Sequence, residues 1–258
     1  IMTDDIKKKI DVVFIAGGKF HDIDFARLEI LKLLAEDDRM KVRVFEDYSN
    51  LHAIEKADFL ITYTCDVRPT LEQQRVLKDY VSSGNRWLAL HGTNSILQFM
   101  SDGKVDSPRI APVMMETLGS QFIAHPPIEP YKVKVVQPDH PLVEGVEEFE
   151  TTDELYLMEL HGKLNVLLEA EYDGKAEGFV EEDWPQENWP VLYLHTVDKG
   201  EVLYLTLGHC RGHYDMHDLP EPLEYYPAVE RCAWDLPVFY TLLRRGINWA
   251  KEEVLKNK

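Results

Sequence analysis

The sequence of 258 residues predicts a single α/β domain in which a mostly parallel β-sheet is flanked by helices. Three observations support this prediction. Apolar runs of strand length alternate with helical patterns through the first half of the chain. Hydrophobic residues make up 45% of the sequence, which is enough for a large core and too many for a disordered chain. Histidines directly follow several apolar runs, which is where open α/β sheets bind their ligands.

The first strand is expected over residues 11–16, a β-branched and aromatic run that is typical of a strand buried on both faces. Gly17-Gly18 ends this run, and Asp22 or Asp24 then caps a helix. Helical spacing places the apolar residues of this helix on one side, namely Phe25, Leu28, Leu31 and Leu34.

The same alternation continues through the next segments. Strands are expected over residues 42–45, 59–63 and 87–90, and between the last two Pro69-Thr70 opens a helix that Ser83-Gly84 ends. The apolar side of this helix carries Leu71, Val76, Leu77, Tyr80 and Val81. Strands that alternate with helices of this length are joined by right-handed crossovers and therefore predict a parallel sheet.

The second half of the sequence is less regular. Residues 108–118 are expected to form a short helix, and residues 131–136 alternate like an edge or antiparallel strand. Further strands and a closing helix are expected over residues 166–170, 191–194, 202–207 and 234–250. The turn signal Asp198-Lys199-Gly200 predicts a hairpin between the last two strands.

Three stretches lack a regular pattern. Residues 137–153 form an acidic connection with proline and glycine. Residues 171–190 and 211–232 are long and rich in aromatic residues and proline, and long ordered loops often act as lids or binding loops. Whether these two form a lid or an interface stays open. Because no repeat or linker divides the chain, we expect one domain over residues 11–250 and an N-terminal extension over 1–10.

The charge of the chain excludes several classes of function. A formal net charge of −18 repels phosphate backbones and anionic lipids, so neither nucleic acid nor a membrane is an expected partner. Cys65, Cys210 and Cys232 form no CxxC pair, which fits a reducing compartment. The sequence shows no signal peptide and no apolar run of about 20 residues. We therefore expect a cytoplasmic protein with a small-molecule partner, whose aromatic loops and last helix permit a homo-oligomer.

Four histidines lie where an apolar run ends and a glycine-bearing turn begins, namely His21, His91, His195 and His209. Because the carboxyl ends of parallel strands meet at one edge of a sheet, we expect these side chains to reach the same crevice. Imidazole is the side chain best suited to proton transfer or metal binding near neutral pH. The pattern therefore predicts a site without specifying its reaction.

A series of short landmarks follows along most of the chain. The landmarks are Gly17-Gly18 with His21-Asp22, Trp87-Leu88-Ala89-Leu90-His91-Gly92, Gly119-Ser120-Gln121-Phe122 with His125-Pro126, Asp139-His140-Pro141-Leu142, Thr152-Asp153-Glu154-Leu155-Tyr156, Gly200-Glu201-Val202-Leu203-Tyr204, Thr206-Leu207-Gly208-His209 and Arg245-Gly246-Ile247-Asn248-Trp249-Ala250. In this order they resemble the ThuA-like (trehalose utilisation) family. The resemblance implies a flavodoxin-like or class I glutamine amidotransferase-like fold, and a role in disaccharide or keto-sugar metabolism.

The resemblance also places His91 at or beside the position where a glutamine amidotransferase carries its nucleophilic cysteine. The matching stretch is Leu90-His91-Gly92-Thr93-Asn94, which contains no cysteine. Cys65 and Cys210 lie outside any strand–elbow–helix pattern. We therefore do not expect this chain to hydrolyse glutamine through a thiol.

Residue types and landmarks together predict which residues form the site. His91 and His209 are expected to transfer protons, with Glu154 or Asp153 orienting one imidazole or serving as the base. Substrate contacts are expected from His21, Asp22, His125, Arg211, Gly18 and Gly92. A divalent metal, either zinc, manganese or iron, is a further expectation, and its candidate ligands are His21, His91, His125 and His209.

Three functions fit these observations. The first is an enzyme that moves a proton on a disaccharide or keto-sugar with this histidine and carboxylate set, with or without a metal. The second is a metal-dependent hydrolase of a glycoside or ester. The third is a sugar-binding or scaffold protein without catalytic activity, built on a degenerate amidotransferase fold. Metal content and turnover distinguish the three.

Overall fold

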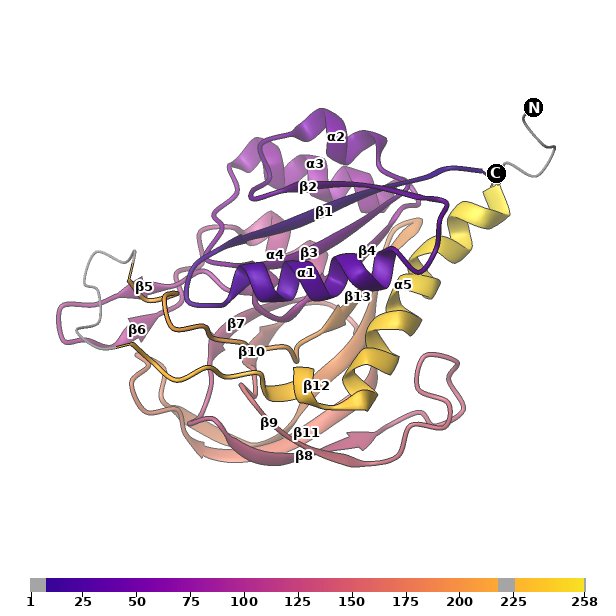
Figure 1. Ribbon diagram of the computed structural model, residues 1–258. Helices are drawn as coiled ribbons and strands as arrows, with labels where there is room; N and C mark the ends of the chain where they lie inside the picture. Colours follow the sequence, from indigo (N-terminus) through magenta and orange to yellow (C-terminus); the bar gives the residue numbers. More distant parts are fainter. Residues whose placement is uncertain (1–7, 218–225, 258) are drawn as a thin grey trace.

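Five parallel strands form one half of the main sheet in the computed structural model, which describes residues 8–217 and 226–257. These strands are β2 (Met40–Phe45), β1 (Ile10–Gly18), β3 (Phe59–Cys65), β4 (Arg86–Leu90) and β13 (Gly200–Leu205), in this order across the sheet. Four antiparallel strands continue the sheet from β13: β12 (Asp183–Val197), β11 (Asn165–Lys175), β8 (Glu129–Val135) and β9 (Phe149–Asp153). The α/β class with a central sheet is confirmed, and the sheet is mixed in its second half (Figure 1).

The remaining elements cover or extend this sheet. The helices are α1 (Ile23–Leu34), α2 (Leu51–Lys56), α3 (Leu71–Ser82), α4 (Pro112–Leu118) and α5 (Pro237–Asn257). Two small ladders pair β7 (Ser120–Ala124) with β10 (Leu157–Leu160), and β5 (Gln98–Phe99) with β6 (Val105–Asp106). Short 3₁₀ turns lie at His91–Asn94 and Cys232–Asp235.

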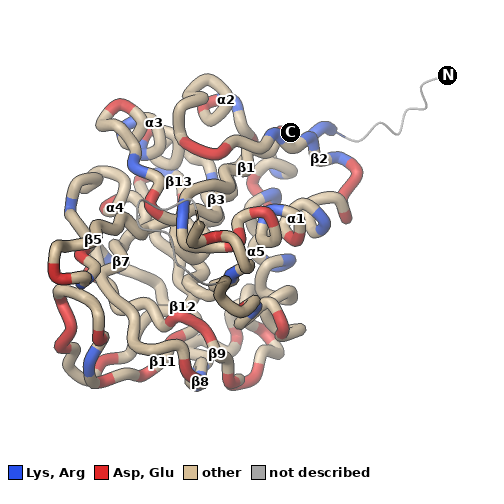
Figure 2. The backbone as a smooth tube through the Cα atoms, turned by 60° about the vertical axis from the view of Figure 1, so that its left-hand side comes forward, with Lys and Arg blue, Asp and Glu red and all other residues tan. Residues whose placement is uncertain are grey.

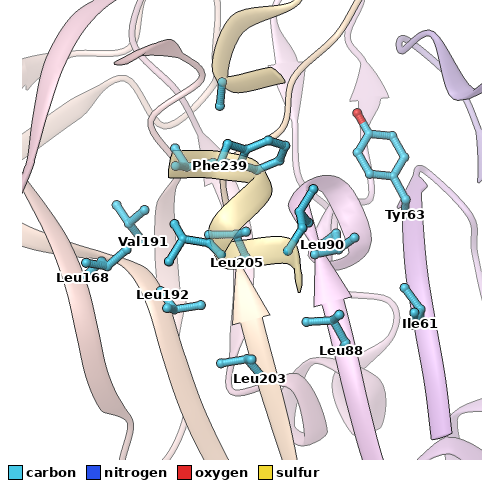
Figure 3. Close-up of a cluster of buried hydrophobic side chains, with 14 of the residues drawn as sticks. Ile61, Tyr63, Leu88, Leu90, Leu168, Val191, Leu192, Leu203, Leu205 and Phe239 are labelled. Atoms are coloured by element: carbon cyan, nitrogen blue, oxygen red, sulfur yellow. The ribbon is translucent and has the colours of Figure 1, made fainter. Parts of the chain in front are cut away.

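The two faces of the parallel half bury different cores, as the continuous apolar run of β1 predicts. Val12 and Phe14 pack with residues of α1 and α5, whereas Val13 and Ile15 pack with residues of α2, α3 and α4. Figure 3 shows the first of these cores beneath the start of α5, where Phe239 lies above Leu205 and Leu90. The helices thus cover both faces and leave the carboxyl edge of the strands open for a site.

The caps of α1 and α3 follow from their sequences. Asp22 Oδ1 accepts a hydrogen bond from the Phe25 amide, and Thr70 forms a capping box with Gln73 at the start of α3. Two residues expected on the apolar sides face water instead: Leu28 is 54% exposed and Leu71 is 49% exposed. Leu28 lies two residues from the buried Ala26 and Ile30, so helical spacing turns it to the opposite side of α1, and Leu71 is the first residue of α3.

Two of the irregular stretches are more regular than expected. Residues 149–153 of the acidic connection form β9, and residues 171–190 belong largely to the long β11–β12 hairpin, so the expectation of an irregular loop is wrong there. In the stretch 211–232, Arg211 and Glu230 form an isolated antiparallel bridge, and residues 218–225 lie outside the described part of the chain.

Strand direction decides which strand ends meet. From β13 the direction reverses at each of four antiparallel pairings, so β9 again runs in the direction of the parallel strands. The carboxyl end of β9 therefore lies on the same edge as the carboxyl ends of β1, β4 and β13. His195 belongs to antiparallel β12, so it lies at the opposite edge, where its Nδ1 donates to Thr117 O. The expectation that His195 reaches the common crevice is wrong.

Charged residues are not gathered in one patch in the view of Figure 2. In the view of Figure 2, Asp and Glu are spread over helices, hairpins and loops of both halves of the molecule. Among the described residues, none of the helices combines the length and the apolar composition needed to cross a lipid bilayer. The acidic composition therefore does not by itself mark a binding surface.

Candidate functional site

The turn after β4 places His91 at the centre of the candidate site. His91 adopts a positive φ of 44°, an uncommon backbone conformation for a residue other than glycine. Tyr204 of β13 fixes this turn, because its hydroxyl donates to His91 O and accepts from the Asn94 amide. Gly92 follows because a Cβ there would lie 2.4 Å from Thr64 O. The chain thus bends sharply and presents the His91 ring at the carboxyl edge of the sheet.

Four side chains from distant parts of the sequence converge at this point. His21 follows β1, His91 follows β4, Glu154 follows β9 and His209 follows β13. One potential ligand atom from each lies within 4.8 Å of those of the other three, and all four residues are buried. The structure therefore brings together three of the four histidines that the sequence places at strand ends.

The hydrogen bonds of the three imidazoles share one pattern. His21 Nδ1 donates to Lys19 O at 3.1 Å, and His91 Nδ1 donates to Thr206 O at 2.7 Å. His209 Nε2 lies 2.7 Å from Glu230 Oε2. Each ring therefore gives one nitrogen to an outer acceptor and turns the other toward the common point. Metal-binding histidines are held in this way by a second partner.

Only one of the three inward nitrogens, His91 Nε2, has a hydrogen-bond donor nearby among the described residues, the Tyr156 hydroxyl at 3.1 Å. Since backbone carbonyls only accept, Nδ1 of His21 and His91 carries the proton, and in the neutral rings each Nε2 holds a lone pair. These two Nε2 atoms face each other at 2.9 Å. His209 Nδ1 is buried and lies 2.8 Å from Glu154 Oε1, but its N–H direction does not make a hydrogen bond. The arrangement concentrates electron-donating atoms around one point.

The charges of the site follow from burial and proximity. Burial, reinforced by His91, holds the pKa of His21 well below its usual value, so this ring is neutral. Burial works against the charged form of Glu154, but the neighbouring His209 and His125 hold its pKa well below the usual range. Burial also disfavours a charged His209, yet Glu154 and Glu230 raise its pKa to about 10. Without a metal, His209 is therefore protonated at neutral pH.

The adjacent acidic residues Asp153 and Glu154 have different surroundings. Asp153 Oδ1 accepts from the amides of Glu154 and His209, and Oδ2 accepts from those of Gly208 and Ala233. All four bonds are between 2.7 and 3.2 Å long. Asp153 therefore ties three chain segments together, whereas Glu154 directs its carboxylate to the histidines. The geometry favours a structural role for Asp153 and a chemical role for Glu154.

A cavity of about 140 Å³ opens beside the cluster. Its lining includes His21, His125, Glu154, Tyr156 and Arg211, together with the aromatic residues Phe20, Phe99, Phe122 and Phe179. His125 Nδ1 donates to Pro126 O, and its Nε2 lies 3.7 Å from Glu154 Oε1. His125 is half-buried, whereas His91 and His209 are fully buried. Of these three, His125 is the histidine that a molecule in the cavity can reach.

Other predicted site residues have local structural roles. Asp22 caps α1 and pairs with Arg231 at 3.1 Å, and it lines a neighbouring groove of about 450 Å³ with Gly18. Gly18 adopts a φ of 105°, and a Cβ there would lie 1.9 Å from Cys65 O. Close backbone approach therefore explains the glycine without a ligand.

Two residues of the site were not predicted. Glu230 holds His209, and the Tyr156 hydroxyl lies 3.1 Å from His91 Nε2. Burial raises the pKa of Tyr156 well above its usual value, so this hydroxyl keeps its proton. Glu230 lies in a stretch without periodicity, and Tyr156 stands in the landmark Thr152–Tyr156 without a pattern that separates it from packing tyrosines. Neither had a sequence signal of its own.

The fold and the site define an α/β protein with a mixed central sheet, whose carboxyl edge carries a cluster of three histidines and one glutamate. The family model ThuA, described as trehalose utilisation, matches residues 11–223. The chain therefore belongs to the ThuA family, and this membership supports a carbohydrate-related function. No curated protein matches the sequence significantly.

Solved structures show the same fold. A ThuA-like protein from Bacteroides uniformis is 15% identical and has a TM-score of 0.66, with 96% of this chain and 94% of that chain covered. A ThuA-like protein from Parabacteroides merdae is 17% identical, with a TM-score of 0.63 and coverages of 95% and 91%. A β-galactosidase from Rahnella is 12% identical, with a TM-score of 0.53, and 97% of this chain matches 32% of it.

Proposed function

We propose that this chain is a metal-dependent enzyme of carbohydrate metabolism that transfers a proton at the carbon beside a sugar carbonyl group. One observation carries the proposal. Three buried imidazoles each give one ring nitrogen to an outer acceptor and turn the other toward the same point, where the Glu154 carboxylate also lies. An arrangement of this kind is characteristic of transition-metal ligands and unusual for packing histidines.

The residues fit a divalent transition metal. His21 Nε2, His91 Nε2, His209 Nδ1 and a Glu154 oxygen would hold it, and nitrogen and oxygen ligands of this kind suit zinc, manganese and iron. His209 Nδ1, which makes no aligned hydrogen bond, and the facing Nε2 atoms of His21 and His91 are the features that such an ion would satisfy. When bound, the ion would supply positive charge that stabilises negative charge on a substrate oxygen.

Proton transfer then falls to the residues that reach the cavity. His125 lines the cavity and offers Nε2 as the base, because its Nδ1 is committed to Pro126 O. The Tyr156 hydroxyl, also in the lining, keeps its proton and can donate a hydrogen bond to a substrate oxygen. In this scheme His91 and His209 act as ligands, and His125 takes the proton-transfer role that the sequence suggested for them.

The size and lining of the cavity support a small carbohydrate. A volume of about 140 Å³ is below the range of roughly 300–1,000 Å³ typical of drug-sized ligands, which favours a monosaccharide over a disaccharide. The aromatic walls offer apolar faces for the C–H groups of a sugar ring. The family's description supports a carbohydrate as the substrate, and the volume of the cavity favours a single sugar unit.

The first experiment measures metal content. Untagged protein purified without chelator is analysed for transition metals beside the variants His91→Ala and His161→Ala, the latter a partly exposed histidine outside the cluster. We expect about one equivalent of metal in the wild type and in His161→Ala, and a loss in His91→Ala. A wild type without metal, which also binds none on titration with zinc, manganese or iron(II), would refute the metal site.

The second experiment detects proton transfer directly, whatever product the reaction forms. Metal-loaded protein is incubated with a panel of aldoses and ketoses in D₂O, and exchange of the hydrogen beside the carbonyl is followed by NMR. We expect exchange that requires metal and is slowed in His125→Asn. Hydrolysis of glycosides or esters without exchange would instead favour a hydrolase, and binding without any turnover would favour a sugar-binding protein.

A further inference from the structure

Arg211 is a cation of the cavity wall with an unsatisfied hydrogen-bonding group. It follows His209-Cys210 after β13, and its backbone N–H and C=O exchange hydrogen bonds of 2.9 Å with Glu230. The bridge fixes where the side chain enters the cavity. Its Nε lies 3.7 Å from Glu230 Oε2, whereas Nη1 is buried and has no partner among the described residues. A buried guanidinium nitrogen without an acceptor is unfavourable unless a ligand supplies one.

Nearby arginines are satisfied by the protein itself. Arg231 donates to Asp22 Oδ2 and to Arg211 O, and Arg68 donates to Asp66 and to Leu97 O. Among the described residues that line the cavity, Arg211 is the single lysine or arginine. The unsatisfied nitrogen is therefore particular to the residue that faces the cavity.

A second polar atom of the same wall is also unsatisfied. Ser95 is buried and lines the cavity, and its Oγ makes no well-aligned hydrogen bond, although it interacts with the Tyr156 hydroxyl. Most of the remaining lining is apolar, with Phe99 and Phe179 among its members. Its histidine, glutamate and tyrosine side chains lie at the end formed by the histidine cluster: His21, His125, Glu154 and Tyr156. One guanidinium and one hydroxyl in an apolar wall form a small site for an anionic oxygen pair.

We propose that the substrate is a sugar acid whose carboxylate binds Arg211, with Ser95 as a second donor. The proposal rests on the function proposed above and names its substrate class: the carboxylate lies at Arg211, and the carbonyl end of the same molecule lies at the histidine cluster. The planar guanidinium matches the two oxygens of a carboxylate. A phosphate group carries more charge and more oxygens than this single guanidinium and its apolar surroundings satisfy.

Binding of matched sugars to metal-loaded full-length protein tests this substrate class. Calorimetry compares D-glucuronate and D-galacturonate, which keep a carbonyl group at C1, with D-glucose and D-galactose, and with their 6-phosphates. We expect at least one acid to bind about tenfold to a hundredfold more tightly than its neutral counterpart, as is usual for a charge-assisted hydrogen bond. Arg211→Gln should abolish this preference and Arg211→Lys should retain part of it. The control Arg231→Gln removes the same charge nearby and should keep the preference.

Several outcomes would overturn the proposal. Neutral sugars that bind as tightly as the acids, an undiminished preference in Arg211→Gln, or no binding by any acid would exclude a carboxylate at Arg211. Stronger binding of the 6-phosphates would assign the anion site to phosphate. Metal content, measured on the same samples, distinguishes failure of the carboxylate site from failure of the metal site. Arg211→Gln should keep the metal content of the wild type. The wild type could hold no metal and still prefer acids, with the preference lost in Arg211→Gln. In that case the anion site is supported and the proposed metal site is wrong.

Discussion

Replacing Asp153 by asparagine tests whether Asp153 has the structural role assigned to it and Glu154 the chemical role. Each Asp153 oxygen accepts two backbone N–H groups, so an asparagine NH₂ in either place leaves two buried amides facing a donor. Each buried group left without its partner costs about 1–3 kcal/mol, which makes about 2–6 kcal/mol for the pair. Since small proteins are stable by about 5–15 kcal/mol in total, Asp153→Asn should be severely destabilised.

The assay is urea unfolding followed by tryptophan fluorescence, with chelator present so that metal binding does not contribute to the stability. Asp24→Asn serves as the control, because the Asp24 side chain is 87% exposed and its loss should change the unfolding free energy by less than about 0.5 kcal/mol. A destabilisation of Asp153→Asn below about 1 kcal/mol would refute the reasoning that Asp153 is an anchor for three segments.

Four further predictions concern the cluster and its frame. His21→Ala removes a proposed ligand and should lower metal affinity, measured by competition with a chromogenic chelator, by more than about 100-fold; an unchanged affinity would exclude His21 as a ligand. Glu230→Ala removes the acceptor of His209 Nε2 and should lower the same affinity by about 10- to 100-fold, with an unchanged circular dichroism spectrum. His125→Asn should lower kcat by about 10²–10⁴-fold at unchanged metal content, and loss of metal instead would make His125 a ligand. Gly18→Ala should destabilise the fold by more than about 2 kcal/mol in thermal unfolding, because its Cβ would meet Cys65 O at a positive φ.

The parallel half of the fold was predictable because its strands are buried on both faces. The runs 11–16, 59–63 and 87–90 are continuously apolar, and they correspond to β1, β3 and β4. The antiparallel half was predicted only in part. The expected strands 131–136, 166–170 and 191–194 correspond to β8, β11 and β12, but β9 and the outer part of the β11–β12 hairpin were missed because they face water on one side and tolerate polar residues. Phe149–Asp153 reads as a turn-rich acidic segment, yet it pairs with β8 along its whole length. Pro185 and Pro190 likewise hid the first part of β12, before the expected strand 191–194.

The residues of the candidate site were also predictable only in part. Histidines at strand ends were visible, because the residue after an apolar run is a position that the sequence reveals. Their direction was not visible: His195 differs from His209 only in that its strand is antiparallel, and this depends on pairing with a distant segment. The outer partners of the imidazoles, Lys19 O, Thr206 O and Glu230, depend on tertiary packing and leave no local pattern.

The strand order has a consequence for synthesis of the protein. β4 is an inner strand of the finished sheet, but its neighbour β13 begins more than a hundred residues later in the chain. Until β13 emerges from the ribosome, the growing chain presents β4 as an open edge of apolar residues. Open edges of this kind recruit other chains, and so this segment is where a stalled or truncated product should begin to aggregate.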